Sequence, residues 1–284
     1  MGVLTRLTLN EINNLIVDEN VSFNSIVGTS SGISDTTYIG ISNTKKYIFK
    51  LYEDASIKDV ENQIEILNSI KNLNVPNVLS KKINLYNNRP ITLLSYIEGD
   101  VIQSITKNHL KQITLFLVSL HSIKDIKITK KDVYSKQNFE TMLFSLSNSS
   151  LKKQITQKYL KVKDIDTKSE ALIHGDLFPD NVKFIDGKLS GVYDFTQSCF
   201  GNILFDIAVV VISWCFENMR FNICYFEYIL NTYNKYTNKS IEKKRIKDYL
   251  LYSCLYYSLQ RIYKNTKKDY SEYLKKFQII DKTV

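Results

Sequence analysis

Glycine and proline are scarce in this sequence. Only 9 of its 284 residues are glycine and 3 are proline, against average usages of about 7% and about 5%. Few flexible linkers are therefore available. Disordered and collagen-like chains are excluded, because 44% of the residues are hydrophobic and 12% are aromatic, which is enough for a packed core. The length predicts one large domain or two lobes.

The four cysteines form no CxxC pair and have no histidine at metal-ligand spacing. This pattern favours reduced, buried thiols in a cytoplasmic protein. Long apolar runs are also missing. The longest, Leu204–Phe216, contains Asp206 and Ser213 and is too short to span a bilayer. Residues 1–9 lack the apolar core of a signal peptide, and we expect no membrane partner.

Acidic residues are fewer than basic ones. The sequence has 29 Asp and Glu against 38 Lys and Arg, a formal net charge of +9. Such a balance suits a polyanionic ligand, RNA or an acidic surface. The excess is mainly lysine scattered among asparagine, without clustered arginine interleaved with aromatic residues. We therefore interpret it as solvated helix faces and expect no nucleic-acid partner.

The first third of the chain alternates β-like runs with short turns. Apolar residues at 3.6-residue spacing predict one helix over 56–73, and Pro76 prevents its continuation. Runs of β-branched and aromatic residues predict strands. The expected strands are Ser22–Val27, Tyr38–Ile41, Tyr47–Tyr52, Val78–Leu85 and Ile91–Ile97.

After Gly99 the pattern becomes mainly helical. One β-rich insert, Ala171–Asp194, interrupts it, with a turn at Asp186-Gly187 between two apolar runs. The helical stretches predicted are 105–122, 138–161, 204–236 and 240–264. The sequence thus predicts an α+β protein with a small β-rich lobe, residues 1–97, and a larger, mainly helical lobe, residues 98–284.

Residues that suit phosphoryl transfer gather in and around this insert. Asn181 follows Asp176 by five positions, the spacing of the protein-kinase catalytic loop, where the Asp takes the proton of the substrate hydroxyl and the Asn binds Mg²⁺. Asp194 comes 18 positions after Asp176, where that template has a second metal-binding Asp. The reaction requires a carboxylate near the nucleophilic oxygen and hard oxygen ligands for the metal.

The rest of such a site is expected upstream. Lys50, on the strand 47–52, is placed to contact the α- and β-phosphates of a nucleotide. Its expected partner is Glu61, with Glu65 as the alternative because both lie on one helix face. The segment 29–37 is the candidate phosphate-covering loop. The contacts expected from this loop are Gly32, Ser34 and Thr36.

Several stretches resemble a known family. His-Gly-Asp-Leu-Phe-Pro-Asp-Asn-Val at 174–182 and Leu-Ser-Gly-Val-Tyr-Asp-Phe at 189–195 resemble the signature of the aminoglycoside phosphotransferase and choline kinase superfamily, and in particular its homoserine kinases. Asp206-Ile-Ala, followed by Trp214-Cys215, is similar to the next block of that family. Gly-Ile-Ser-Asp-Thr-Thr-Tyr at 32–38 resembles its loop Gly-Ile-Glu-Asn-Thr-Asn-Tyr. The resemblance runs over most of the chain.

The resemblance implies a protein-kinase-like two-lobed fold and transfer of the γ-phosphate of ATP to a small alcohol, with Mg²⁺ as cofactor. Lobe 1–97 would bind the nucleotide, and lobe 98–284 would carry catalysis and the substrate. The implied roles are Asp176 as catalytic base, Asn181 and Asp194 as Mg²⁺ ligands, Lys50 as a phosphate contact, and the backbone of Ser95 to Ile97 as the adenine contact. A pseudokinase typically loses one of these groups, and all are present.

The expected acceptor is L-homoserine, within threonine biosynthesis. His174, Asp206 and Arg261 are the candidate substrate contacts, with two alternatives open: His174 as a core histidine and Asp206 as a brace of the catalytic loop. The sequence departs from the family at Ile212-Ser213, where the family commonly has Asn-Asp, and at 256–261. The alternative function is therefore a kinase of the same fold for choline, ethanolamine, a sugar or an aminoglycoside. We expect a monomer or a homodimer.

Overall fold

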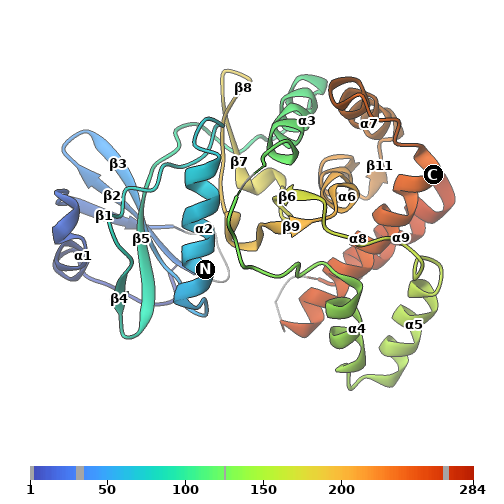
Figure 1. Cartoon of the computed structure of the whole chain (residues 1–284), viewed down its shortest axis with the longest axis horizontal. Coiled ribbons are helices and arrows are strands. Elements are labelled where there is room, and N and C mark those ends of the chain that lie inside the picture. The colour runs from blue at the N-terminus through green and yellow to red at the C-terminus, as the bar shows by residue number, and fades with distance from the viewer. Residues whose placement is uncertain (1–2, 30–34, 125, 265–268) are drawn as a thin grey trace. The chain divides into compact units, whose positions relative to one another are not determined.

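The computed structural model describes residues 3–29, 35–124, 126–264 and 269–284 (Figure 1). The chain forms two compact units. Unit 1 comprises Met1–Asp100, Asp125–Lys130 and Ser190–Thr196, and unit 2 comprises Val101–Lys124, Lys131–Leu189 and Gln197–Val284. The division after Asp100 lies close to the boundary predicted after residue 97. It differs in that two later segments join unit 1, and one of them carries Asp194.

Unit 1 is built on a five-stranded antiparallel sheet with the strand order β1-β2-β3-β5-β4. Its strands are β1 Ser25–Gly28, β2 Thr36–Ser42, β3 Lys45–Leu51, β4 Asn84–Tyr86 and β5 Arg89–Ser95. The strand predicted over 78–85 is mostly wrong, because only its last two residues enter β4 and Val78 makes a single isolated bridge to Leu94.

The two faces of this sheet have different roles. Phe49 and Leu51 are fully buried, in a cluster that includes Ile12 of helix α1 (Leu9–Leu15). Because side chains alternate along a strand, Lys50 belongs to the opposite face. Helix α2 (Ile57–Ser69) contacts β5 and begins at a capping box between Ser56 and Asp59. The helix predicted over 56–73 is thus confirmed, with an earlier end.

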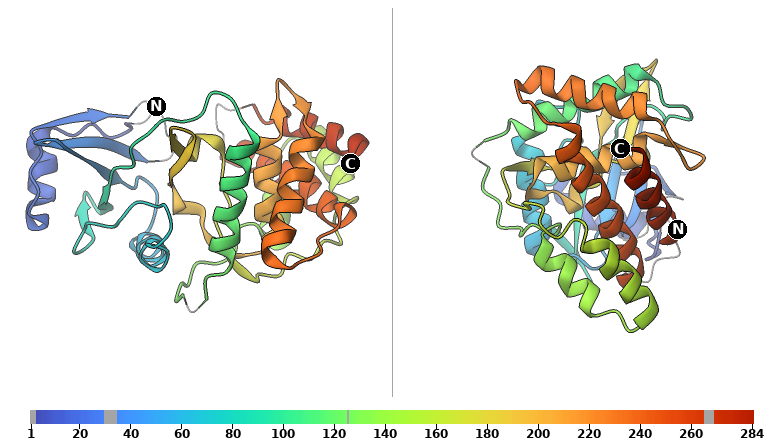
Figure 2. Two further views of the ribbon diagram at one scale, coloured as in Figure 1. Left: turned by 90° about the horizontal axis from the view of Figure 1, so that it is seen from above. Right: turned by 90° about the vertical axis from the view of Figure 1, so that its right-hand side faces the viewer.

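Unit 2 is mainly helical. Its helices are α3 Lys107–His121, α4 Lys136–Phe144, α5 Ser149–Tyr159, α6 Ile203–Trp214, α7 Ile223–Thr237, α8 Lys243–Tyr263 and α9 Ser271–Thr283. Every residue of α6 except Ser213 is buried. Helix α8 packs against α6 and α9, and α3 lies beside α7 (Figures 1 and 2). Helix α6 is therefore the centre of this unit.

Two stretches predicted as continuous helices are broken. The first, 138–161, forms α4 and α5, because Asn148 caps a new helix by accepting from the Leu151 amide. The second, 204–236, forms α6 and α7, separated by a hairpin of β10 (Phe216–Glu217) and β11 (Arg220–Phe221). Both breaks lie at short polar stretches, residues 145–150 and residues 217–220, whose turn-forming residues the helical periodicity on either side did not take into account.

The β-rich insert is confirmed. Strand β6 (Ala171–Ile173) pairs antiparallel with β9 (Cys199–Gly201). Strands β7 (Val182–Ile185) and β8 (Lys188–Val192) form a two-stranded ribbon, and both turn residues between them, Asp186 and Gly187, have positive φ. The segment between β6 and β7, residues 174–181, ends in a short 3₁₀ helix, Pro179–Asn181.

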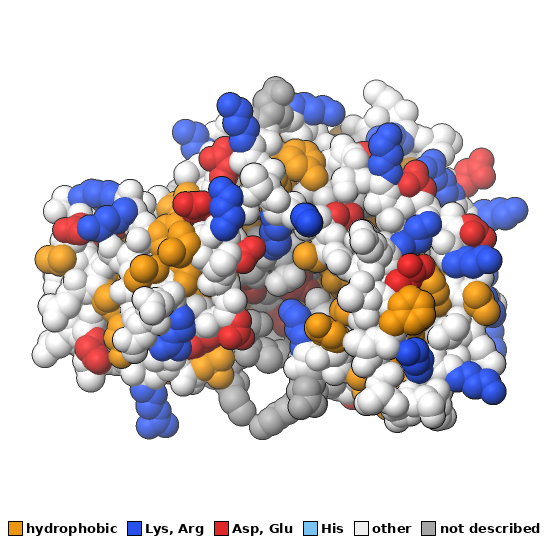
Figure 3. Space-filling model, turned by 60° about the horizontal axis from the view of Figure 1, so that its bottom comes forward, with side chains coloured by type: hydrophobic (Ala, Val, Ile, Leu, Met, Phe, Trp, Pro, Cys, Tyr) orange, Lys and Arg blue, Asp and Glu red, His pale blue; other side chains and the backbone are white. Residues whose placement is uncertain are grey.

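On the face shown in Figure 3, Lys and Arg side chains lie interspersed with Asp and Glu.

All four cysteines are free; Cys224 is exposed and the other three are buried. In the described parts of the chain, no helix combines the length and apolarity needed to cross a membrane.

Candidate active site

The loop 174–181 of unit 2 is shaped by one glycine and one buried carboxylate. Gly175 has a φ of +73°, and a Cβ atom there would collide with the Tyr134 hydroxyl, so the position requires glycine. The backbone N–H groups of His174 and Gly175 donate to the Asp206 carboxylate at 2.9 and 2.8 Å. Asp206 therefore fixes the chain immediately before Asp176.

Asp206 is itself part of a buried series of hydrogen bonds. Its side chain is 0% exposed, and its Oδ2 lies 3.0 Å from His121 Nε2. His121 Nδ1 lies 2.8 Å from the Tyr233 hydroxyl. Burial alone would raise the pKa of Asp206, but the hydrogen bond and charge of His121 outweigh it and the pKa is lowered. Asp206 is therefore an anion that accepts from both loop amides.

Side chains from two helices satisfy carbonyl oxygens of the same loop. Trp214 Nε1, on α6, donates to the Leu177 carbonyl at 2.9 Å. The Tyr257 hydroxyl, on α8, donates to the Gly175 carbonyl. Both aromatic side chains are buried, where an unpaired carbonyl is costly. The loop is thus held through its donors and its acceptors.

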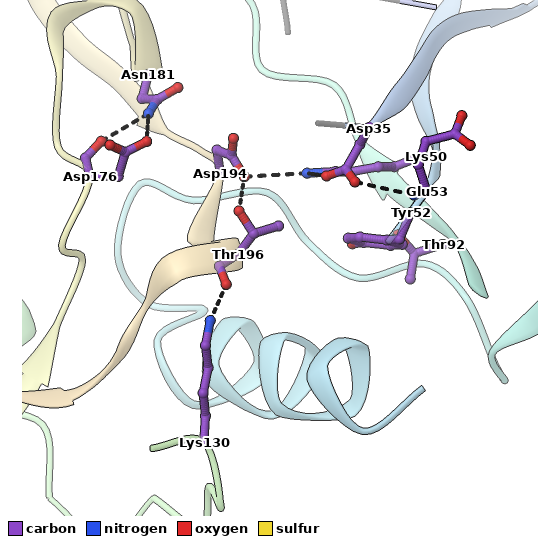
Figure 4. A network of polar contacts seen from close by, with 10 residues as sticks. All are labelled: Asp35, Lys50, Tyr52, Glu53, Thr92, Lys130, Asp176, Asn181, Asp194 and Thr196. Atoms are coloured by element: carbon purple, nitrogen blue, oxygen red, sulfur yellow. Dashed lines mark hydrogen bonds and ion pairs between the residues drawn. The ribbon is translucent and has the colours of Figure 1, made fainter. Parts of the chain in front are cut away.

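Within this loop, Asp176 and Asn181 are hydrogen bonded to each other (Figure 4). Asn181 Nδ2 donates to the Asp176 carbonyl at 2.8 Å and to its Oδ2 at 3.2 Å. Because the amide nitrogen faces Asp176, the oxygen of Asn181 points away from it, as Figure 4 shows. The pair therefore presents a carboxylate and a hard amide oxygen from one short segment.

In unit 1, Lys50 is a buried cation between two carboxylates (Figure 4). Its Nζ lies 3.0 Å from Asp35 Oδ2 and 3.3 Å from Asp194 Oδ1, and the residue is 8% exposed. Burial alone would lower the pKa of Lys50, but the charges of Asp194 and Asp35 outweigh it and raise the pKa. Lys50 is therefore charged throughout the physiological pH range.

Asp194 combines an unusual backbone with a fixed carboxylate. Its φ is +65°, in the left-handed region that few residues other than glycine adopt. Besides Lys50, its Oδ1 accepts from the Thr196 hydroxyl at 2.7 Å, and Lys130 Nζ donates to the Thr196 carbonyl. These contacts hold the carboxylate through one of its oxygens (Figure 4).

The donor types in each unit fit Mg²⁺. The Asn181 oxygen in unit 2 and the Asp194 carboxylate in unit 1 are the hard ligands that this ion prefers. Proteins usually supply Mg²⁺ with one or two such groups and leave the remaining positions to phosphates and water. The structure describes no cluster of three or more His, Cys, Asp or Glu for a metal in the residues it covers. That Asn181 and Asp194 share one ion stays a prediction, since they belong to different units.

The expected pair between Lys50 and Glu61 does not form. Glu61 instead pairs with Lys58 at 3.2 Å, and both side chains are more than half exposed. Glu65 is exposed as well. The two glutamates share a face of α2, as expected, but that face is the solvated one. Asp35 and Asp194 supply the carboxylates of Lys50 instead.

Thr36 is not placed to contact a phosphate. It is 0% exposed, and its hydroxyl accepts from the amides of Leu4 and Thr5 at 2.9 and 2.8 Å and donates to Glu53. This prediction is corrected because every hydrogen-bonding site of the hydroxyl is used internally. The predicted contacts Gly32 and Ser34 lie outside the described residues.

The predicted adenine contacts lie at the end of β5. The Ser95 amide donates to the Asn77 carbonyl at 2.9 Å, so this donor is already engaged within unit 1. The Ile97 side chain packs closely against Gly191, and a Cβ atom on Gly191 would collide with the Ile97 side chain. An adenine contact from the backbone of Ile97 stays a prediction.

Two of the three predicted substrate contacts are buried. His174 and Asp206 are both 0% exposed, and each side chain accepts from backbone amides of the loop, so neither is accessible from the surface. The alternative role of Asp206, as a brace, is the one that the structure shows. Arg261 Nη1 pairs with Glu272 at 3.0 Å, and its guanidinium lies 4.3 Å from the centroid of the Tyr273 ring. Its contact with a substrate stays a prediction.

Several residues of the site were missed, among them Trp214, Tyr257 and Asp35. Trp214 was noted only as part of the family resemblance, and nothing in its helical stretch marks Tyr257 as a loop anchor rather than an ordinary core residue. Asp35 carried a signal, because it lies in the candidate phosphate-covering loop where the resembling family has asparagine. Its charge made it a candidate partner for Lys50.

A family model describing the phosphotransferase enzyme family, APH, matches residues 25–222. The match spans more than half of the chain and includes the loop 174–181, Lys50 and Asp194. The chain belongs to this family. It is a small-molecule phosphotransferase.

Particular relatives are homoserine kinases. The homoserine kinase of Sinorhizobium medicae (strain WSM419) is 24% identical over 98% of this chain and 94% of its own length. That of Sinorhizobium fredii (strain NBRC 101917 / NGR234) is 25% identical over the same shares of both chains. The similarity therefore extends over nearly the whole of each protein.

Solved structures show the same fold. The aminoglycoside phosphotransferase APH(4)-Ia matches with a TM-score of 0.71 at 11% identity, over 98% of this chain and 100% of its own. The choline kinase LicA from Streptococcus pneumoniae matches with a TM-score of 0.69 at 20% identity, over 95% and 97%. The prediction of an α+β, protein-kinase-like fold with a small β-rich lobe and a larger helical lobe is confirmed.

Proposed function

We propose that this enzyme is a cytoplasmic, ATP- and Mg²⁺-dependent kinase that transfers the γ-phosphate to the hydroxyl of L-homoserine and yields O-phospho-L-homoserine, a step of threonine biosynthesis. The observation that carries the proposal is the paired arrangement of Asp176 with Asn181 and of Lys50 with Asp194. These are the groups that kinase-type phosphoryl transfer requires. The homoserine kinase relatives, aligned over nearly their full length, support the acceptor.

Unit 1 binds the nucleotide in this proposal. Lys50 contacts the α- and β-phosphates, for which its permanent charge is suited. Asp194 of unit 1 and Asn181 of unit 2 would supply oxygen ligands to Mg²⁺, which would neutralise charge on the phosphates during transfer. Catalysis by such a site rests on positioning and charge stabilisation rather than on a covalent intermediate.

Unit 2 binds the acceptor and carries the base. The Asp176 carboxylate orients the acceptor hydroxyl and takes its proton as the oxygen attacks the γ-phosphorus and the bond to the β-phosphate oxygen breaks. The carboxylate is suited to this because Asn181 and the His174 ring, which accepts from the Asp176 amide at 3.2 Å, fix its segment. A fixed base close to the hydroxyl is what lowers the entropic barrier.

The acceptor is tested with a substrate panel. The purified enzyme is assayed with ATP and Mg²⁺ by coupled detection of ADP, with L-homoserine, D-homoserine, L-serine, choline, ethanolamine and hygromycin B as acceptors. We expect a kcat/KM for L-homoserine at least about 100-fold above the others, because one well-placed polar contact is worth about tenfold or more. Mass spectrometry of the product confirms phosphate on the acceptor.

The control is the Asp176→Asn enzyme, which reports ATP hydrolysis by contaminants. A kcat/KM for choline, ethanolamine or hygromycin B above that for L-homoserine would replace the acceptor and leave the phosphotransferase assignment intact. ADP production that no acceptor increases would contradict the proposal as a whole.

A further inference from the structure

Two carboxylates contact Lys50, and the proposed reaction requires only one of them. Asp194 is needed as a metal ligand, but Asp35 has no role in that scheme. Asp35 Oδ2 is nonetheless the nearer partner, at 3.0 Å from the ammonium nitrogen against 3.3 Å for Asp194. The side chains of Lys50 and Asp35 are only 10% and 15% exposed. The nearer of the two carboxylates is therefore the one without a role in the proposed reaction.

The surroundings of Asp35 favour its ion pair with Lys50. It directly precedes β2, in the segment predicted to cover the phosphates, and its Oδ1 accepts from the Glu53 amide at 3.4 Å. The nearby Glu53 carboxylate is neutralised by Arg89. Within the described residues, Lys50 is the one cation that Asp35 contacts. The two charges compensate each other in a nearly dry environment, where electrostatic interactions are strong.

We propose that Asp35 competes with the nucleotide phosphates for Lys50 and so lowers the affinity of the enzyme for ADP and ATP. The inference rests on the proposed function, because it takes Lys50 as the contact to the α- and β-phosphates. A phosphate that approaches Lys50 meets an ammonium already neutralised and a carboxylate that repels it. The resembling family loop has asparagine at this position, so an uncharged side chain there is compatible with the fold.

The test is the nearly isosteric variant Asp35→Asn, which keeps an oxygen to accept from the Glu53 amide and removes the charge. Titration calorimetry with Mg²⁺·ADP, ADP alone and adenosine measures affinity for ligands with and without phosphates. We expect the Kd for ADP to fall about tenfold, the scale of one charged hydrogen bond. The Kd for adenosine should change less than about twofold, because adenosine has no phosphate for Lys50.

The matched control is Asp18→Asn, the same chemical change in an exposed pair with Lys82 of unit 1. It should leave all three affinities unchanged. Thermal melting of each variant verifies the fold, and Asp35→Ser provides a second uncharged side chain if Asn alters the loop. Both uncharged variants should bind ADP more tightly than the wild type.

The outcomes separate the inference from the proposed function. Equal or weaker ADP binding by folded Asp35→Asn and Asp35→Ser enzymes, with adenosine binding intact, would overturn the competition and assign Asp35 to the positioning of Lys50. Absence of ADP binding to the wild type and to every variant would instead reject the nucleotide site, and the inference with it. Tighter ADP binding restricted to the Asp35 variants establishes the competition.

Discussion

The two units hold their functional residues in different ways. In unit 1, Lys50 and Asp194 are held by contacts between side chains, two of them between opposite charges. In unit 2, Asp176 is fixed through the backbone of its loop, which is bonded to Asp206 and Tyr257. The first arrangement suits a group that must exchange its partners. The second suits a group that must not move.

Because of this difference, substitutions in the two units should change different measured quantities. Removal of a charge that contacts Lys50 should alter nucleotide affinity and leave the fold intact, whereas removal of a solvated charge of α2 should change neither. Changes in the anchors of unit 2 should alter stability or turnover, because each anchor is a buried hydrogen bond whose loss leaves an unpaired group. Four substitutions test this distinction, from the largest expected effect to the smallest.

Asp176→Asn should lower kcat by about 100- to 10,000-fold, the usual contribution of a general base. The Asn181 bond to the Asp176 carbonyl does not involve the side chain, so the loop should keep its shape. Steady-state kinetics with L-homoserine measures the loss, and calorimetry should give an unchanged Kd for ADP. A kcat within tenfold of the wild type would remove Asp176 as the base.

Asp206→Asn should destabilise unit 2 by about 3 kcal/mol, because it leaves a buried donor unpaired and removes the charge opposite His121. The shift of the urea unfolding midpoint measures this loss. The control is Asp281→Asn, the same change in a more exposed pair with Lys161, which should move the midpoint little.

The pH dependence gives an independent check of Asp206. Its folded pKa lies below the ordinary value of 3.8, so its charge stabilises the folded state above that pH and this contribution is lost as the pH falls through the folded pKa. Asparagine does not titrate, so the variant should lose less stability in acid than the wild type. Parallel stability curves for the two proteins would show that Asp206 is not a charged brace.

Tyr257→Phe should have a smaller effect, about tenfold in kcat, because it removes one hydrogen bond to the loop and keeps the ring. The Kd for ADP should stay constant. Tyr252→Phe is the matched control, since its hydroxyl also donates to a buried carbonyl, that of Tyr134, at 2.8 Å. An equal fall of kcat in both variants would mean that the effect reports general packing.

Glu61→Gln should change the KM for ATP less than about twofold. The side chain is exposed, and in the described parts of the chain its ion pair is with Lys58, one helical turn away; such surface pairs contribute little. Steady-state kinetics at varied ATP measures the change. A tenfold rise in the KM for ATP would indicate that Glu61 pairs with Lys50 when ATP is bound. It would contradict the distinction between charges that contact Lys50 and solvated charges.

Local chemistry in the sequence predicted much of the fold. The β-branched and aromatic run Tyr47–Tyr52, the start of the helix near Ser56 and the turn at Asp186-Gly187 all depend on a few neighbouring residues, and each appears where expected. Helix α1 was not predicted, because its seven residues are too short for a clear amphipathic pattern. The hairpin after α6 was missed because each of its strands has only two residues, too few for a strand pattern.

The candidate site was predicted where its chemistry follows from spacing along the chain. Asp176 and Asn181 are five positions apart and their hydrogen bond is local. The partner of Lys50 depends instead on which face of α2 is buried and on where the segment before β2 lies, and neither is fixed by sequence distance. Partners distant in the sequence, such as Tyr257 for Gly175, depend on helix packing that spacing does not encode.

At Asp194, the free-energy cost of a left-handed backbone is combined with the polar contacts of a carboxylate. Glycine would adopt a φ of +65° without the steric penalty, about 1 to 2 kcal/mol, that an L side chain meets there. Glycine offers no oxygen to a cation and no charge to Lys50. Glycine at this position would relieve the backbone strain but would leave Lys50 and Thr196 without this carboxylate, so the strain and the polar contacts of unit 1 are linked at one residue.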